Sequence, residues 1–155
     1  MVKTMEWQHN ALEILDQTKL PVEISFIKCG TYRRVGEAIK KLEVRGAPAI
    51  GAAAGFAMVL GWQQLMAENR CNLPAYEKIK NELIAARPTA VNLAWAANKL
   101  YAEAERLTEQ SKTQSEIACA LEKLAQQIYA DDIECNKKMG RYGAELLPPH
   151  THILT

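Results

Sequence analysis

The sequence lacks a marked excess of charge of either sign. It has 19 basic and 18 acidic residues, which gives a net charge of +1. Nucleic-acid-binding proteins usually carry a basic surface, and interaction tails usually show as runs of like charge. We therefore expect no nucleic acid as a partner. We expect no membrane either, because the longest apolar run, residues 47–62, is shorter than the roughly 20 residues of a spanning helix.

Cysteine and histidine are too few and too scattered to indicate a zinc site. The four cysteines stand at positions 29, 71, 119 and 135, no two of them in a CxxC pair, and none has a histidine at metal-ligand spacing. Residues 1–10 have no apolar segment of the kind that a secretory signal needs. We expect free, mostly buried thiols in a reducing cytoplasm.

What the chain does have is 48% apolar residues over 155 positions, which is enough for one domain with a core. Alternating apolar residues within 11–28 predict a small antiparallel hairpin with residues 16–21 as its connection. Thr31 then stands as an N-cap before the period becomes helical. The predicted fold class is α+β and mostly helical, with a small N-terminal antiparallel β region followed by a helical bundle.

Apolar stripes at helical spacing predict the bundle. The last helical region contains Asp131 followed by Glu134, a pattern that resembles a capping box. Either one helix ends near residue 130 and another starts, or a single long helix runs through a polar step. The other predicted helices carry stripes at Val35, Ala38, Ile39 and Leu42, over residues 47–66, at Tyr76, Ile79, Leu83 and Ala86 after Pro74, and from Leu93 to Leu107.

The last residues differ in character from the bundle. Residues 148–152 (PPHTH) predict a connection, and residues 153–155 (ILT) begin an apolar, β-branched segment. A strand of two or three residues pairs weakly. We therefore expect a β-plus-helical domain over residues 1–147, with a linker and the truncated first strand of a missing α/β domain at residues 148–155.

Residues 44–51 (VRGAPAIG) have the composition of an anion site at a helix start. Proline is favoured in the first helical turn, whose free N–H groups point outward where the helix dipole is positive. Gly46 lets a ligand approach the main chain, and Arg45 adds a planar, permanent charge suited to phosphate oxygens. The alternative is a tight turn into a buried helix, with Arg45 paired to a carboxylate.

A second arginine–proline step, Arg87-Pro88-Thr89, repeats this arrangement. A residue before proline avoids the helical conformation, so the preceding helix is expected to end at Arg87 and Thr89 to cap the next helix. Taken alone, Arg87 is better explained as a cation at a helix C-terminus than as a ligand-binding residue.

Other residues that carry chemistry in proteins fit structural roles better. We expect Asp131 and Asp132 to form a helix cap on a solvated face, and His150 and His152 to lie in a solvated linker. The three tryptophans, Trp7, Trp62 and Trp95, are expected to be packing groups. No pair of residues forms a convincing nucleophile and base.

Four stretches together resemble one family: residues 14–21 (ILDQTKLP), 44–51, 87–93 (RPTAVNL) and 140–147 (GRYGAELL). In this order and spacing they are similar to the methylthioribose-1-phosphate isomerases. That group is related to the regulatory subunits of translation initiation factor 2B and to ribose-1,5-bisphosphate isomerases. The resemblance covers essentially the whole chain.

The resemblance implies conversion of 5-methylthioribose 1-phosphate to 5-methylthioribulose 1-phosphate in methionine salvage, without metal or organic cofactor, by cytoplasmic homodimers. It assigns substrate contacts to Arg45, Gly46, Ala47 and Arg87. It also implies a larger Rossmann-like C-terminal domain with a catalytic cysteine and aspartate beyond Thr155, so this chain alone is expected to be inactive. The alternatives are a ribose-1,5-bisphosphate isomerase and a non-catalytic, regulatory-subunit-like binding module.

Overall fold

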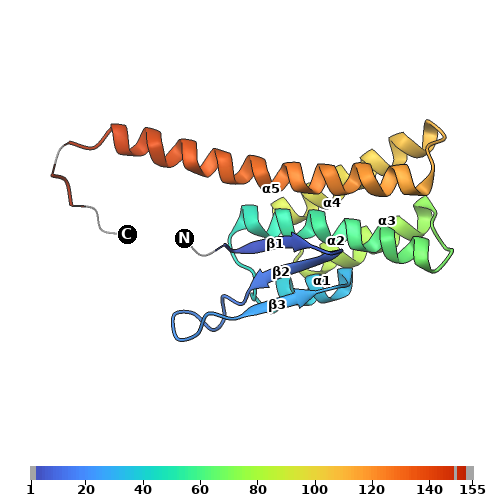
Figure 1. The fold of residues 1–155 in the computed structure, drawn as a ribbon, viewed down its shortest axis with the longest axis horizontal. Coiled ribbons are helices and arrows are strands. Elements are labelled where there is room, and N and C mark those ends of the chain that lie inside the picture. The colour runs from blue at the N-terminus through green and yellow to red at the C-terminus, as the bar shows by residue number, and fades with distance from the viewer. Residues whose placement is uncertain (1–2, 149, 153–155) are drawn as a thin grey trace.

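A computed structural model of the chain describes residues 3–148 and 150–152. Figure 1 shows a small sheet beside a helical bundle, with the longest helix running along one side. This architecture confirms the predicted α+β, mostly helical fold class. Segment 153–155, predicted to start a strand, lies outside the described residues. The elements are β1 (Met5–Gln8), β2 (Ala11–Leu15), β3 (Phe26–Cys29), α1 (Tyr32–Lys40), α2 (Ala47–Ala67), α3 (Leu73–Ala86), α4 (Val91–Glu109) and α5 (Gln114–Glu145).

The sheet is antiparallel throughout, in the order β1-β2-β3. His9 and Asn10 both have positive φ, which is typical of the tight turns that join hairpin strands. The β1 strand was not predicted. The predicted second strand also starts too early, because Val22 and Ile24 are 93% and 60% exposed and lie in the connection between β2 and β3.

Turns inside this connection explain the error. The Asp16 carboxylate accepts hydrogen bonds from the hydroxyl and the backbone N–H of Thr18, at 2.6 and 3.0 Å. The amides of Val22 and Glu23 both donate to the carbonyl of Lys19. The backbone groups that a strand would need are therefore already paired in turns.

Helix α2 forms the centre of the bundle and packs against α1, α3, α4 and α5. The helix has 21 residues, more than the apolar run seen in the sequence, and its length and composition would allow it to cross a membrane. However, 78% of its most apolar 18-residue stretch is buried inside the fold. Its glycines allow close packing: a Cβ at Gly61 would lie 2.7 Å from Ile79 Cγ2. The helix therefore serves as the core of this domain.

Helix α1 begins as predicted, with the Thr31 side chain accepting from the Arg34 amide at 3.2 Å. It ends earlier than predicted. Leu42 has a left-handed φ of 61° and is 40% exposed, so it does not belong to the buried stripe. The stripes predicted for α3 and α4 are confirmed at Tyr76, Ile79, Leu83, Leu93, Ala97, Leu100, Ala104 and Leu107, all of them buried. Ala86, predicted as the last buried residue of the α3 stripe, is only half-buried at the end of that helix.

Helix α5 is a single helix from Gln114 to Glu145. Its capping box is Thr113 with Glu116, and of the two alternatives near residue 130 the structure shows the single long helix and not the break. Asp131 instead accepts a hydrogen bond from the Gln127 side chain at 2.7 Å within the helix. The C-terminal half of α5 extends past the rest of the bundle (Figure 1), which leaves Met139 and Tyr142 more than half exposed.

The cysteines are only partly as predicted. All four are free, but Cys119 and Cys135 are exposed, Cys71 is half-buried, and only Cys29 is fully buried. The expectation of mostly buried thiols is therefore wrong for Cys119 and Cys135, the two cysteines on α5. Burial raises the pKa of the Cys29 thiol to about 11, which keeps it protonated at neutral pH.

Candidate functional site

The start of α2 depends on a glycine for its backbone conformation. Gly46 is the N-cap with φ of 88° and ψ of 127°, a region that residues with a Cβ rarely adopt. A Cβ at this position would meet no atom within 4 Å, so conformation and not packing requires glycine here. Pro48 lies in the first turn, and the Ile50 amide donates to the Gly46 carbonyl at 2.9 Å. The N–H groups of the first turn have no acceptor within the helix.

The start of α4 is built differently from the prediction. Arg87 ends α3 in an extended conformation, with φ of −151°, as expected for a residue before proline. The N-cap of α4 is Ala90, whose amide donates to the Arg87 carbonyl at 3.0 Å. Thr89 therefore does not cap this helix, because the turn places Ala90 at the position that a capping side chain would need.

The two helix starts converge because Gly51 allows α4 to approach α2. A Cβ at Gly51 would lie 3.0 Å from the Asn92 carbonyl oxygen, so the helices touch through backbone at this point. A pocket of about 280 Å³ opens there, and the predicted site residues Gly46, Ala47 and Arg87 all line it. The other lining residues are Ile50, Thr89, Ala90, Val91 and Asn92.

Arg45 lies beside this pocket and not in its wall. Its side chain is exposed, and its Nε–H donates to the Leu42 carbonyl at 3.2 Å. Within residues 3–148 and 150–152, neither Arg45 nor Arg87 forms an ion pair with a carboxylate. The alternative of a structural pair for Arg45 is therefore wrong for this part of the chain. The pocket combines two positive helix ends with one cationic side chain in its wall.

A second hollow adjoins the first. It measures about 320 Å³ and runs between the starts of α2 and α4 and the middle of α5. Asn92 borders both hollows. Trp95 lines the second one and is 51% exposed, so the prediction of a packing role is wrong for this tryptophan. Trp7 and Trp62 do pack as predicted, at 5.0 Å from the Phe56 ring and 4.9 Å from the Tyr76 ring between centroids.

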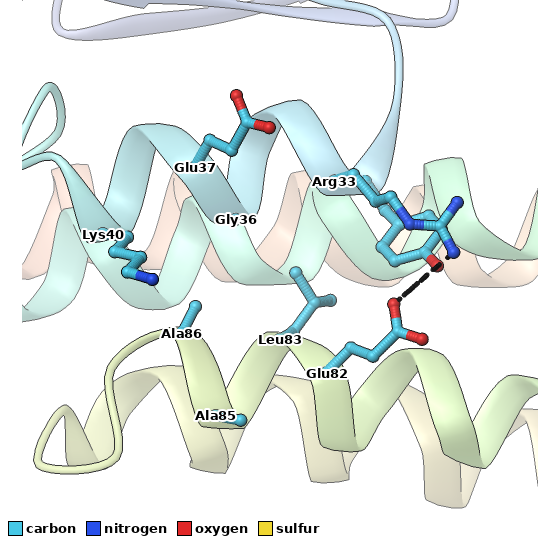
Figure 2. Close-up of a pocket in the computed structure, with 9 residues that line it drawn as sticks. Arg33, Gly36, Glu37, Lys40, Glu82, Leu83, Ala85 and Ala86 are labelled. Atoms are coloured by element: carbon cyan, nitrogen blue, oxygen red, sulfur yellow. Dashed lines mark hydrogen bonds and ion pairs between the residues drawn. The ribbon is translucent and has the colours of Figure 1, made fainter.

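A third pocket lies between α1 and α3 and is drawn in Figure 2. It measures about 430 Å³, and none of the four predicted site residues lines it. Its Glu82 already accepts a hydrogen bond from the Tyr32 hydroxyl at 2.8 Å and lies 3.7 Å from the Arg33 guanidinium. Burial, followed by this hydrogen bond to Glu82, raises the pKa of Tyr32 to about 12. These groups are paired with one another, which favours a structural role.

Comparison with known proteins agrees with the predicted resemblance. A sequence profile described as the Initiation factor 2 subunit family matches residues 43–155. The chain belongs to the initiation factor 2 subunit family. Curated relatives in this family include the methylthioribose-1-phosphate isomerases of Desulforamulus reducens, 48% identical over 96% of this chain, and Carboxydothermus hydrogenoformans, 48% identical over 98% of it.

Two solved structures share this fold. The 5-methylthioribose 1-phosphate isomerase of Pyrococcus horikoshii matches 96% of the chain with a TM-score of 0.83 and 38% identity. Translation initiation factor eIF-2B subunit delta from A. fulgidus matches 97% of it with a TM-score of 0.82 and 32% identity. The chain spans only 43% of the length of both curated isomerases named above.

The site predicted from the sequence did not include Asn92 or Trp95, which line the hollows at the helix starts. The small residues of α2 indicated that some neighbour would approach closely, and Gly51 is the position where this happens. The sequence alone does not show which helix supplies that neighbour, because contacts between distant segments leave no local pattern. Asn92 belongs to the motif at residues 87–93, but nothing in the sequence assigns it a role of its own.

Proposed function

We propose that this chain forms the phosphate-holding part of a methylthioribose-1-phosphate isomerase, which converts 5-methylthioribose 1-phosphate to 5-methylthioribulose 1-phosphate. The observation that carries the proposal is the convergence of two helix starts on one pocket, with Arg87 in its wall and unpaired with any described carboxylate. The names of relatives at 48% identity support the same substrate. We further propose a cytoplasmic homodimer as the working form of the complete enzyme.

Each proposed site residue has a physical role in holding a phosphate. The first-turn N–H of Ala47 donates to an oxygen at the positive end of α2. Gly46 sets the direction in which that turn begins, through its φ of 88°. Arg87 supplies a guanidinium that binds two phosphate oxygens at once. Arg45 lies at the rim, and its Nε–H donates to the Leu42 carbonyl. Its terminal N–H groups take no part in that hydrogen bond, and we assign them to the ligand.

These residues position the substrate and neutralise its charge, and they do not move protons. The phosphate on C1 blocks opening of the sugar to a free aldehyde, so hydrogen must pass from C2 to C1 by other means. The described lining of the pocket contains no carboxylate, thiol or imidazole. We therefore propose that this pocket holds the phosphate without supplying an acid or a base. Following the resemblance to the isomerases, we also propose that the catalytic acid–base groups come from outside this chain and that the chain alone does not turn over substrate.

A non-catalytic binding module is the second candidate. It is favoured by the likeness to translation initiation factor eIF-2B subunit delta from A. fulgidus, which has the same fold at 32% identity. The isomerase of Desulforamulus reducens is more similar, at 48%. Neither motif arginine forms an ion pair within the described residues, and a module without a phosphate ligand has no need for two guanidinium groups without a carboxylate partner beside a pocket.

A chimera tests the proposal. This chain replaces the matching segment of the Desulforamulus reducens enzyme, and isomerisation of 5-methylthioribose 1-phosphate is measured. We expect an active chimera in which Arg87→Ala raises KM about tenfold or more, because a hydrogen-bonded charge contributes about 1.5–3 kcal/mol. Arg70→Ala is the control, since Arg70 is exposed and pairs with Glu68 outside the pocket. An active chimera indifferent to Arg87→Ala would overturn the site, and an inactive one would favour the binding module.

A further inference from the structure

The hollow beside the phosphate pocket, here called the Trp95 groove, begins where that pocket ends. Asn92 forms part of both walls. Pro48 and Gly51 line the groove, and each follows directly on a residue that lines the phosphate pocket, Ala47 and Ile50. From this shared wall we infer that a ligand whose phosphate is held at the helix starts extends the rest of its body into the groove.

The near wall of the groove is apolar and aromatic. Trp95 is half exposed, although large aromatic side chains are usually well buried in a folded protein. Ile128 and Pro48 line the same space. The Lys99 ammonium lies 4.9 Å from the centre of the Trp95 ring, so one face of the ring is occupied by a cation. The remaining aromatic surface suits a small apolar or sulfur-containing group.

The α5 side of the groove is acidic. Asp131 and Asp132 both line it, and neither carboxylate forms an ion pair among the described residues. Their recorded partners are neutral side chains, Gln127 for Asp131 at 2.7 Å and Asn136 for Asp132 at 2.9 Å. Lys99 is the sole cation in the described lining, so two negative charges face one positive charge. A phosphate, with about −1.5 to −2 charges, is disfavoured here.

We propose that the Trp95 groove binds the 5-methylthio end of the substrate and rejects a second phosphate at that position. The inference rests on the proposed function and deepens it. The methylthio group lies against the indole ring, where a thioether makes favourable contacts with an aromatic edge. Asp131 and Asp132 repel a 5-phosphate, which separates this substrate from ribose 1,5-bisphosphate. Cys135, also in the lining, adds a weakly polar thiol and takes no part in covalent chemistry.

The test is calorimetric titration of the full 155-residue chain with inorganic phosphate, ribose 1-phosphate, 5-methylthioribose 1-phosphate and ribose 1,5-bisphosphate. We expect Trp95→Ala to leave phosphate affinity unchanged and to weaken 5-methylthioribose 1-phosphate about tenfold, the effect of losing one small apolar contact. Trp95→Phe should restore most of that loss. The double change Asp131→Asn and Asp132→Asn should tighten ribose 1,5-bisphosphate several-fold and leave the other ligands unaffected. Tyr142→Ala removes a similarly exposed aromatic outside the groove and serves as the control.

The outcomes separate the two proposals. Equal weakening of all ligands by Trp95→Ala would mean a structural role and would overturn the groove assignment, as would unchanged preference for the methylthio sugar over ribose 1-phosphate. Unchanged phosphate binding in Arg87→Ala would instead overturn the phosphate pocket, even where Trp95→Ala still alters the preference among sugars. Absence of phosphate binding by the unaltered chain would overturn both.

Discussion

Adding one methyl group at Gly51 should disturb both the stability of the bundle and the phosphate pocket. A Cβ at this position would lie 3.0 Å from the Asn92 carbonyl oxygen and 3.2 Å from Asn92 Cβ. The neighbour is backbone in the first turn of α4, so it cannot rotate away as a side chain could. Gly51→Ala must therefore push the start of α4 outward by a few tenths of an ångström, and the wall of the pocket moves with it.

The magnitude follows from two opposed effects. Replacing glycine by alanine inside a helix stabilises the fold by about 0.5–1 kcal/mol. Overpacking a well-filled contact costs about 1–3 kcal/mol. We expect a net loss of about 1 kcal/mol, which corresponds to roughly 2–4 °C in melting temperature for a chain of this size. Displacing the amides of the α4 start should also weaken phosphate binding roughly threefold, since misplacement by a full ångström costs far more.

Gly55→Ala is the matched control for this substitution. It lies in the same helix, but its Cβ would sit at an ordinary contact distance of 3.6 Å from Ala125. The gain in helix stability from alanine is the same in both variants. The difference between their free energies of unfolding therefore measures the effect of the contact with Asn92. Urea unfolding and phosphate titration of both variants are the assays. A Gly51→Ala variant as stable as Gly55→Ala, with unchanged phosphate affinity, would refute the argument that backbone contact between α2 and α4 shapes the pocket.

Three further predictions concern other parts of the fold. Hydrogen bonds from Thr18 lower the pKa of Asp16 below its usual 3.8. The stability that the Asp16 carboxylate provides is therefore complete above pH 3.8 and is lost as the pH falls through the lower pKa of the folded state. In acid unfolding, the stability of Asp16→Asn should depend less on pH than that of the unaltered chain, and an identical pH dependence would contradict this. Thr113→Ala removes one half of the α5 capping box and should cost about 1 kcal/mol in urea unfolding; no change would mean that the cap is dispensable. In the native state at pH 8, the exposed thiols of Cys119 and Cys135 should react rapidly with a disulfide reagent. Cys29, with its pKa raised to about 11, should react only on unfolding, and rapid reaction of Cys29 would show that its site opens.

The helices could be predicted from sequence because each depends mainly on its own spacing of apolar residues. The stripe on α4, from Leu93 to Leu107, is fully buried as expected. The errors occur where local side-chain chemistry competes with that spacing. Val22 and Ile24 alternate as a strand would, but the turns at Asp16 and Lys19 occupy the backbone. Asp131 and Glu134 have the spacing of a capping box, yet a capping box stands at the start of a helix, and α5 passes through these residues without interruption.

In the candidate site too, features set by neighbouring residues could be predicted, whereas contacts between residues far apart in the sequence could not. The starts of α2 and α4 were visible separately, because proline, glycine and arginine act within a few residues of chain. Their meeting at one pocket depends on Gly51 facing Asn92, a contact between residues far apart in sequence. Trp95 was predicted to pack because most tryptophans do. Its exposure follows from the course of α5, which passes beside the start of α4 and leaves the groove between them open.

Backbone and side chains contribute differently to what distinguishes this chain within its family. The fold recurs, at TM-scores of 0.83 and 0.82, in an isomerase and in an initiation factor subunit, so the fold by itself does not determine function. The outward N–H groups at the helix starts come with the fold, and any member that keeps these two helices keeps them. Arg87, Trp95, Asp131 and Asp132 are side chains and can change without altering the fold. Under the two proposals, Arg87 is the residue among these four that holds the phosphate, and Trp95, Asp131 and Asp132 are the residues that favour a methylthio group over a second phosphate.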